Sequence, residues 1–120
     1  MSTSVGEKFL HGKCKPCAKD APALDEQTAL GYLRHLPGWA LSTDGRQIGR
    51  EYVMKDFSSA VRLIERICEV AEAEDHHPDL HLTSYRKMRV ELSTHAIGGL
   101  SENDFILAAK IESLPKDLKK

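Results

Sequence analysis

A long amphipathic segment in the middle of the chain constrains the fold more than any other feature of the sequence. Apolar side chains recur there at steps of three and four residues: Phe57, Ala60, Val61, Ile64, Ile67, Cys68 and Ala71. This period predicts a helix that begins at Asp56 or Ser58 and buries one face, the Cys68 thiol included. Pro78 has no amide hydrogen and disfavours helical geometry in the residue before it, so we expect the helix to end near His76.

Two pairs of short alternating segments flank this helix and predict a sheet that its apolar face can cover. Within the first pair, Asp44-Gly45 lies between the segments and is a strong signal for the turn of a β-hairpin. Within the second pair, Met88, Val90 and Leu92 alternate with polar side chains, as in a strand with one buried face. The predicted strands are residues 39–42, 47–54, 80–85 and 87–95.

Helical patterns on either side of these segments complete the expected order. Asp25 can cap a helix that runs to about Leu36. Ser101 with Asp104 resembles a capping box that opens a last helix, which Pro115 stops. The order helix, strand, strand, helix, strand, strand, helix predicts a single α+β domain, with a four-stranded, largely antiparallel sheet and helices packed on one face.

The two ends of the chain carry no comparable pattern. Residues 1–22 mix Gly, Lys, Ser and Pro without a sustained apolar period, and they predict a flexible N-terminal arm that is extended or partly disordered. The folded domain is expected at residues 23–116, followed by a C-terminal tail at 117–120. A length of 120 residues agrees with one such domain.

Charge and hydropathy narrow the expected partners. Lys and Arg number 17 and Asp and Glu number 18, a net charge of −1, so no positive excess steers the chain onto nucleic acid as a direct partner. No apolar run approaches the roughly 20 residues that span a bilayer, and residues 1–7 lack the segments of a signal peptide. We therefore expect no membrane partner and a cytoplasmic location. The open edges of the predicted sheet favour a homodimer or homotetramer.

Histidines gather in the second half of the chain. Four of the six lie within twenty residues: His76, His77, His81 and His95. Predicted loops adjoin this cluster, and loops carried by rigid strands are common places for catalytic side chains. Because imidazole titrates near neutral pH, the cluster predicts a site that donates and accepts protons.

An ordered set of residues around these histidines resembles the pterin-4a-carbinolamine dehydratase family, known also as the dimerisation cofactor of a homeodomain transcription factor. The family pattern is an acidic residue, three residues, His-His-Pro, a short gap, an aromatic residue, nine residues, His, and later an Asp. This chain supplies Glu72, His76-His77-Pro78, Tyr85, His95 and Asp104. Further matches extend the similarity over residues 23–114: Gly38-Trp39, Lys55-Asp56-Phe57, Ser93-Thr94-His95 and Gly99-Leu100-Ser101. In one departure, Leu80 stands where an aromatic residue often follows the His-His-Pro.

The resemblance implies a dehydratase without metal or cofactor that removes water from 4a-hydroxytetrahydrobiopterin to give quinonoid dihydropterin, a step in tetrahydrobiopterin recycling. The reaction breaks the bond from C4a to oxygen and removes the N5 proton, so it needs an acid at the hydroxyl and a base near N5. By resemblance, the catalytic residues His76, His77 and His95 converge on one pocket that takes a pterin substrate. We expect His76 to be the acid and His95 a binding group or base. The implied supporting or substrate-binding residues are Glu72, Pro78, Tyr85 and Asp104.

The supporting residues also have structural alternatives that the sequence leaves open. Glu72 lies four residues before His76, one helical turn away if the helix persists, and could fix its tautomer or could simply be solvated. Asp104 could serve only as a helix cap. Tyr85 could be a strand aromatic in the core.

Two other classes of function compete with this interpretation, a metal or redox site and a protein-binding module. His11, Cys14 and Cys17 have the spacing of metal ligands, but the second cysteine pair of a zinc ribbon is missing. Cys14-Lys-Pro-Cys17 also lacks the strand-to-helix setting of a redox motif. The other alternative is a binding module that docks on a protein partner, as the family's second name implies. The motif histidines favour catalysis, because an adaptor has no chemical need for them.

Overall fold

The computed structural model describes residues 5–16 and 21–120, and its elements follow the predicted order with one helix added at the N-terminus. The helices are α1 (Val5–His11), α2 (Glu26–Leu33), α3 (Phe57–Glu74) and α4 (Glu102–Ser113), with a short 3-10 helix, η1 (His95–Ile97), before α4. The strands are β1 (Ala40–Leu41), β2 (Ile48–Val53), β3 (Asp79–Thr83) and β4 (Lys87–Leu92).

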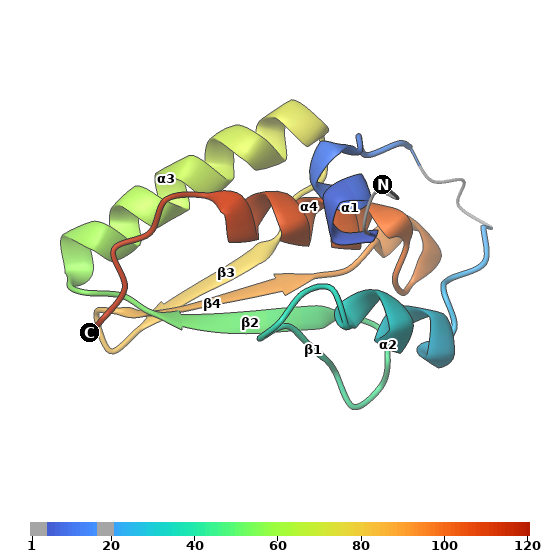
Figure 1. Ribbon diagram of the computed structural model, residues 1–120, viewed down its shortest axis with the longest axis horizontal. Coiled ribbons are helices and arrows are strands. Elements are labelled where there is room, and N and C mark those ends of the chain that lie inside the picture. Colours follow the sequence, from blue (N-terminus) through green and yellow to red (C-terminus); the bar gives the residue numbers. More distant parts are fainter. Residues whose placement is uncertain (1–4, 17–20) are drawn as a thin grey trace.

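The four strands form one antiparallel sheet in the order β1-β2-β4-β3 (Figure 1). The central strands β2 and β4 pair along their whole lengths, with Tyr52 opposite Met88. In β4, Met88 and Val90 are buried whereas Lys87 and Arg89 are exposed, so one face of the sheet is apolar. Figure 1 shows α3 and α4 on the same side of this sheet. The predicted α+β fold, with an antiparallel sheet and helices on one face, is confirmed.

The two ends of α3 are fixed by the residues that flank it. Asp56 caps the N-terminus, because its carboxylate accepts a hydrogen bond of 2.8 Å from the Ser59 amide. At the C-terminus, Asp75 adopts the left-handed backbone conformation, with φ of 51°. The chain therefore leaves the helical path just before His76, as Pro78 predicted.

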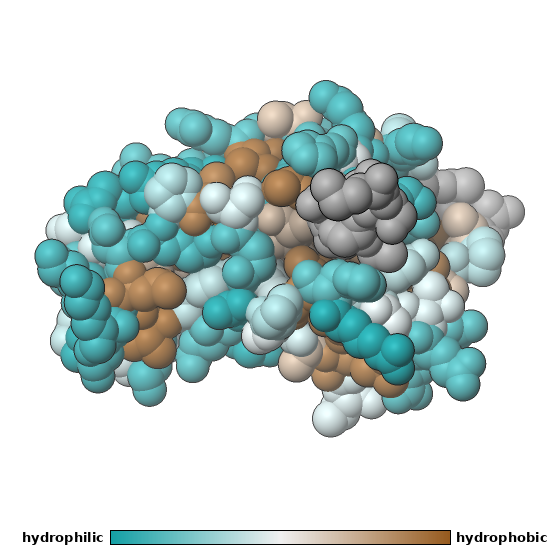
Figure 2. Space-filling model, viewed as in Figure 1, coloured by the Kyte–Doolittle hydropathy of each residue, from teal (hydrophilic) through white to brown (hydrophobic). Residues whose placement is uncertain are grey.

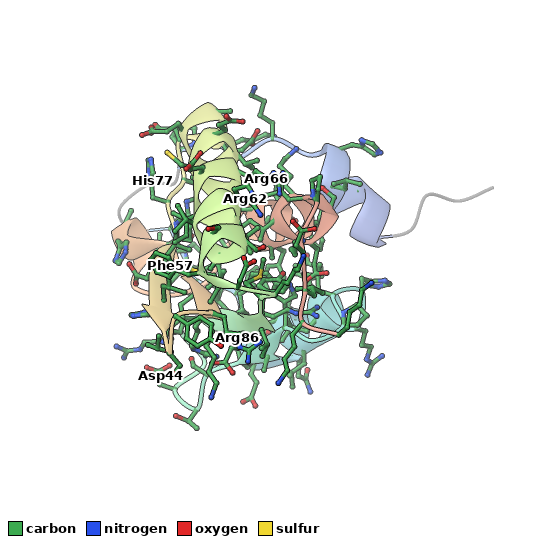
Figure 3. All side chains as sticks on the ribbon, turned by 90° about the vertical axis from the view of Figure 1, so that its left-hand side faces the viewer. Asp44, Phe57, Arg62, Arg66, His77 and Arg86 are labelled. Carbon is green, nitrogen blue, oxygen red and sulfur yellow. The ribbon has the colours of Figure 1, made fainter. Side chains whose placement is uncertain are left out.

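The buried face of α3 is narrower than the sequence predicted. Its buried apolar residues are Ala60, Leu63, Ile67 and Ala71. Phe57 and Cys68 were expected in the same buried stripe, and this prediction is wrong because both are exposed. Cys68 follows Ile67 directly, and consecutive positions of a helix are rotated by about 100°, which turns the thiol away from the core. Figure 3 shows Phe57 and His77 at opposite ends of α3.

α4 is buried along most of its length and carries the predicted capping box. The Ser101 side chain accepts a hydrogen bond from the Asn103 amide, and the Asp104 carboxylate accepts one from the Ser101 amide. Phe105 and Leu107 are completely buried. Because α4 packs against both α1 and α3, its N-terminus is held firmly next to the end of α3.

The C-terminal part of α4 is tied to the sheet by one carboxylate. Glu112 Oε1 accepts hydrogen bonds from Trp39 Nε1 at 3.1 Å, from Arg50 Nη1 at 2.7 Å and from the Tyr52 hydroxyl. These contacts satisfy polar groups that the fold buries at the edge of its core, and they fix where α4 lies over β2.

The N-terminal segment contains a helix that the sequence analysis did not predict. Phe9 of α1 is 3% exposed and packs against the rings of Tyr32 and Phe105, at centroid distances of 4.9 and 5.8 Å. Lys110 also donates a hydrogen bond of 2.8 Å to the Leu10 carbonyl. The expectation of an extended arm is therefore wrong for residues 5–11, because tertiary packing supplies the stability that so short a helix lacks alone. The rest of the expected arm includes residues 1–4 and 17–20, which lie outside the described residues.

Figure 2 shows a mainly hydrophilic surface on which apolar patches are separated from one another. The large apolar side chains that remain exposed are Leu30, Val53, Phe57, Tyr85 and Leu118. Arg62 and Arg66 of α3 (Figure 3) reach the C-terminal segment, where Arg66 Nη1 donates a hydrogen bond of 3.0 Å to the Pro115 carbonyl. Across residues 5–16 and 21–120, every helix is too short or too polar to cross a membrane.

Candidate active site

The His-His-Pro segment forms the loop between α3 and β3. Because Asp75 ends the helix, His76 turns toward α4, and its side chain is only 12% exposed. Its Nε2 lies 2.6 Å from Asp104 Oδ1. His77 has 55% of its side chain exposed, and Pro78 leads into β3. The two neighbouring histidines thus have different surroundings, as the proline's effect on His77 would favour.

Asp104 is fully buried and holds the ring of His76. Its carboxylate accepts hydrogen bonds from His76 Nε2, from the Thr94 hydroxyl at 2.9 Å and from the Ser101 amide at 3.0 Å. Since a carboxylate that accepts these bonds places the shared proton on the histidine, we assign the proton to Nε2. The Nδ1 atom of His76 is then the nitrogen that can exchange a proton with a ligand.

Glu72 contacts a different histidine from the one that its spacing suggested. Its Oε2 lies 3.4 Å from His77 Nε2, and both side chains are more than half exposed. The possible contact with His76 required the helix to continue to that residue, two positions beyond its end at Glu74, but Asp75 ends it first. Asp104 makes the contact with His76 that Glu72 could have made if the helix had persisted.

His95 approaches His76 from the C-terminal end of the sheet strand β4. It opens η1, a few residues after β4 ends at Leu92. A cavity of about 400 Å³ lies between this loop and the end of α3, a volume in the range of small-molecule sites. Its lining includes Glu74, His76, His77, Pro78, Ser93, Thr94, His95 and Asn103. The three motif histidines, separated by up to nineteen positions in the sequence, therefore line one cavity.

Tyr85 is the one motif residue that lies far from this cavity within the chain. It occupies the turn between β3 and β4 with a positive φ of 54°, and it is 55% exposed. The guanidinium of Arg86 lies over its ring, 5.1 Å from the centroid. Because β3 runs away from His77 and β4 returns to His95, the turn is at the opposite end of the hairpin from the histidines. The alternative position for Tyr85, as a strand aromatic in the core, is also wrong because its side chain is exposed.

Three residues of the N-terminal segment line the cavity, and the sequence analysis missed them as site residues. They are Cys14, Lys15 and Pro16. The Cys14 amide donates to Glu74 Oε1 at 2.8 Å, and the Lys15 amide donates to Asn103 Oδ1 at 2.9 Å. Most of these contacts use backbone groups, which leave no side-chain pattern to find in a sequence.

The Cys14 thiol has an environment unlike that of a reactive cysteine. Burial, reinforced by the nearby Glu74 carboxylate, raises its pKa to about 12. It is therefore a neutral thiol near pH 7, whereas the thiolate is the form that attacks electrophiles and binds metals. In the described part of the chain, no three His, Cys, Asp or Glu side chains are grouped so that they could hold a metal ion. Cys17 lies outside the described residues.

Comparison with known proteins agrees with the similarity found in the motifs. The family model described as pterin 4 alpha carbinolamine dehydratase matches residues 22–114. Pterin-4-alpha-carbinolamine dehydratase 2, mitochondrial, of Arabidopsis thaliana is 47% identical over 105 residues, covering 85% of this chain and 56% of the plant protein. The chain thus spans little more than half of that relative's length.

Two bacterial proteins are similar over nearly their whole length. One, from Halorhodospira halophila, is named provisionally as a pterin-4-alpha-carbinolamine dehydratase and is 46% identical over 101 residues, covering 84% of this chain and 92% of the relative. The other is a crystal structure of a transcriptional coactivator/pterin dehydratase from Brucella melitensis, with a TM-score of 0.71 and 33% identity over 76% of this chain and 96% of that chain. The resemblance stated from the motifs is confirmed.

Proposed function

Because the chain belongs to the pterin 4 alpha carbinolamine dehydratase family, a family of hydro-lyases, we propose that it removes water from 4a-hydroxytetrahydrobiopterin by histidine acid/base catalysis. The observation that carries this proposal is the arrangement of His76. Its Nε2 is held at 2.6 Å by the fully buried Asp104, on the wall of a cavity that His77 and His95 share. A ring oriented in this way can present Nδ1 to a bound substrate without first reorganising.

The proposed step is a balanced loss of water. Protonated His76 gives the Nδ1 proton to the C4a hydroxyl, and the C4a–oxygen bond breaks with its electron pair leaving on the water. The electrons of the N5–H bond form the C4a=N5 double bond of quinonoid dihydropterin, while His95 accepts the N5 proton. His77, which lines the same cavity beside Glu72, frames the ligand. Proton exchange with solvent then restores both catalytic histidines.

The activity is tested with the purified chain and no added partner. Chemically generated 4a-hydroxytetrahydrobiopterin loses water slowly by itself, so the formation of quinonoid dihydropterin is followed above that background. We expect the rate to rise in proportion to protein concentration. A folded protein that leaves the background rate unchanged would contradict the proposed activity.

We further propose that the enzyme acts in tetrahydrobiopterin recycling as a cytoplasmic homo-oligomer. The exposed edge strand β3 (Asp79–Thr83) offers backbone groups that a second copy could pair with. The location is tested by cell fractionation, since one relative carries the word mitochondrial in its name. Loss of recycled tetrahydrobiopterin in cells that lack the chain would test its metabolic role.

A further inference from the structure

We propose that residues 14–16, here called the wall segment, form a substrate-contacting wall of the active-site cavity, and that Asn103 is the positioning residue that holds this wall in place. The inference rests on the proposed function and adds a determinant of substrate binding to it. The wall segment precedes residues 22–114, which the family model matches, so it adds to the site from outside the region that defines the family.

The first observation is where the wall segment lies. Cys14, Lys15 and Pro16 line the same cavity of about 400 Å³ as the three histidines. They approach it from the side of α4, beside Asn103 and Glu74, while Ser93 and His95 approach from the end of β4. A ligand that fills this cavity next to His76 therefore has the wall segment as a neighbour.

The second observation is how Asn103 holds the wall segment. Its side-chain oxygen accepts a hydrogen bond of 2.9 Å from the Lys15 amide, and its side-chain nitrogen donates one of 2.6 Å to the Lys15 carbonyl. Asn103 is 8% exposed, at the start of α4 next to Asp104. The amide thus binds the backbone of Lys15 as a neighbouring strand would, with two hydrogen bonds that fix the position of Lys15 relative to α4.

Additional contacts fix the segment on the N-terminal side of Lys15. The Cys14 amide donates to Glu74 at the end of α3, and the Cys14 thiol lies 3.5 Å from the Asn103 carbonyl. Upstream, the buried ring of Phe9 anchors α1 against the core. The wall is therefore in place before a substrate arrives, and its contacts are available equally to the substrate and the transition state. Interactions of that kind lower KM and change kcat little.

The chemistry of the wall favours contact over catalysis. The pKa of Cys14 is raised to about 12, so its thiol neither attacks a pterin nor accepts the N5 proton near pH 7. Pro16 presents an apolar ring. We therefore expect the wall segment to exclude water from one side of the pterin and to supply packing area, while proton transfer stays with the histidines.

The first experiment uses Cys14 as a reporter in the otherwise native chain. In a Cys17→Ser, Cys68→Ser protein, Cys14 is the single thiol, and its alkylation by iodoacetamide is followed by mass spectrometry at pH 9. A 7,8-dihydropterin, added at a concentration that inhibits dehydration, should slow the alkylation by about tenfold if the ligand covers the wall. Inhibition without any protection of Cys14 would overturn the proposal, and this result does not depend on an altered Asn103.

The second experiment separates positioning from general stability. Asn103→Ala should speed alkylation of Cys14 and raise KM by about tenfold, with kcat changed less than about threefold. Lys110→Met is the matched control, because it removes the hydrogen bond to the Leu10 carbonyl of α1 without touching the cavity. We expect its KM to equal that of the unaltered protein.

The inference would be overturned if KM were unchanged in Asn103→Ala, or if KM rose equally in Asn103→Ala and Lys110→Met. If Asn103→Ala does not fold, the protection experiment decides the inference by itself. An unaltered chain that shows no dehydration at all would instead contradict the proposed function, so the two failures are distinguishable.

Discussion

His76 differs from the other two histidines of the cavity in how its ring is held. Asp104 is completely buried and makes contacts with His76, Thr94 and Ser101 at once, so the imidazole has little freedom to rotate. His77 and His95 are more exposed and have no such support from a buried carboxylate in the described structure. A fixed ring is suited to proton transfer, whereas an exposed one is suited to contacting a ligand that arrives from solvent.

Replacing the histidines one at a time should separate these roles. His76→Ala removes a proton donor that acts mainly in the transition state, so kcat should fall by roughly 10² to 10⁴ while KM changes little. His95→Ala should raise KM, because His95 also binds the ligand, and should lower kcat less than His76→Ala does, because solvent water can accept the N5 proton in its place. Steady-state kinetics above the uncatalysed background measure both constants.

His35→Ala is the matched control for these variants. His35 is exposed and lies outside the cavity, so its loss should leave both constants unchanged. If His95→Ala lost kcat and His76→Ala lost only affinity, the two roles would be exchanged. If kcat and KM were unchanged in both variants, the proposal of histidine catalysis would be wrong.

Asp104→Asn tests whether the carboxylate positions His76 or only caps α4. The asparagine keeps the shape of the side chain but has a single oxygen, which can still accept the hydrogen bond from Thr94. Its NH₂ group then takes the place of Oδ1 and donates a hydrogen bond to His76 Nε2. The neutral ring should then carry its proton on Nδ1, which ¹⁵N NMR of the labelled histidine detects. We expect kcat to fall by roughly 10- to 100-fold, the usual effect of losing an orienting partner.

The matched control is Asp25→Asn, which alters the cap of α2 away from the cavity. Its kcat and the His76 tautomer should be unchanged. A stable Asp104→Asn protein with an unchanged tautomer and full activity would restrict Asp104 to its structural role.

At the scale of elements, the site is made where the C-terminus of α3, the C-terminus of β4 and the N-terminus of α4 meet. Hydrophobic periodicity predicts α3 and β4, because apolar residues recur with the period of a helix around Ile67 and with the period of a strand around Val90. The capping pattern of Ser101 with Asp104 predicts the start of α4. Their meeting point follows from the antiparallel order of the sheet. The motif therefore predicted that the three histidines gather, which local spacing could not do, but it wrongly placed Tyr85 with them within the chain.

The features that the sequence did not predict depend on a local break in the helix or on contacts with distant residues. Glu72 reaches His77 and not His76, because the left-handed Asp75 breaks the helical spacing on which the expectation relied. Likewise, α1 is stable through Phe9 and the rings that it meets far along the chain. The Asn103 side chain binds the backbone amide and carbonyl of Lys15, and any residue type except proline at position 15 would offer the same two groups. The sequence therefore carried no signal of this contact.

A pair of phenylalanine variants measures whether α1 belongs to the core. Phe9→Ala removes a ring that is 3% exposed, so the free energy of unfolding in urea should fall by about 3 to 5 kcal/mol. Phe57→Ala is the matched control, because that ring is 54% exposed on another helix, and its cost should be less than about 1 kcal/mol. Equal effects of the two substitutions would show that α1 detaches from the folded protein in solution.

At the scale of the whole molecule, the sheet ends in the edge strand β3, whose backbone groups face outward on one side. We expect sedimentation equilibrium to give a mass of two or more chains. Thr83→Lys places a charged, strongly hydrated side chain on this edge and should weaken association, because an edge lysine disfavours pairing with a further strand. Thr43→Lys, in the turn between β1 and β2, is the matched control and should associate normally. A monomer at all concentrations would contradict the predicted oligomer.

The last prediction is that the whole enzyme turns over without a metal ion. Imidazole can both donate and accept protons near neutral pH, so the loss of water needs no Lewis acid to activate the leaving hydroxyl. Cys14, the member of the cysteine pair that lines the cavity, has a pKa of about 12 and is not a thiolate at the pH of the assay. Dialysis against a strong chelator should therefore leave kcat and KM unchanged when the assay buffer is also metal-free. A collapse of turnover that zinc alone reverses would replace histidine catalysis with a metal site that includes Cys17 or other residues outside the described part of the chain.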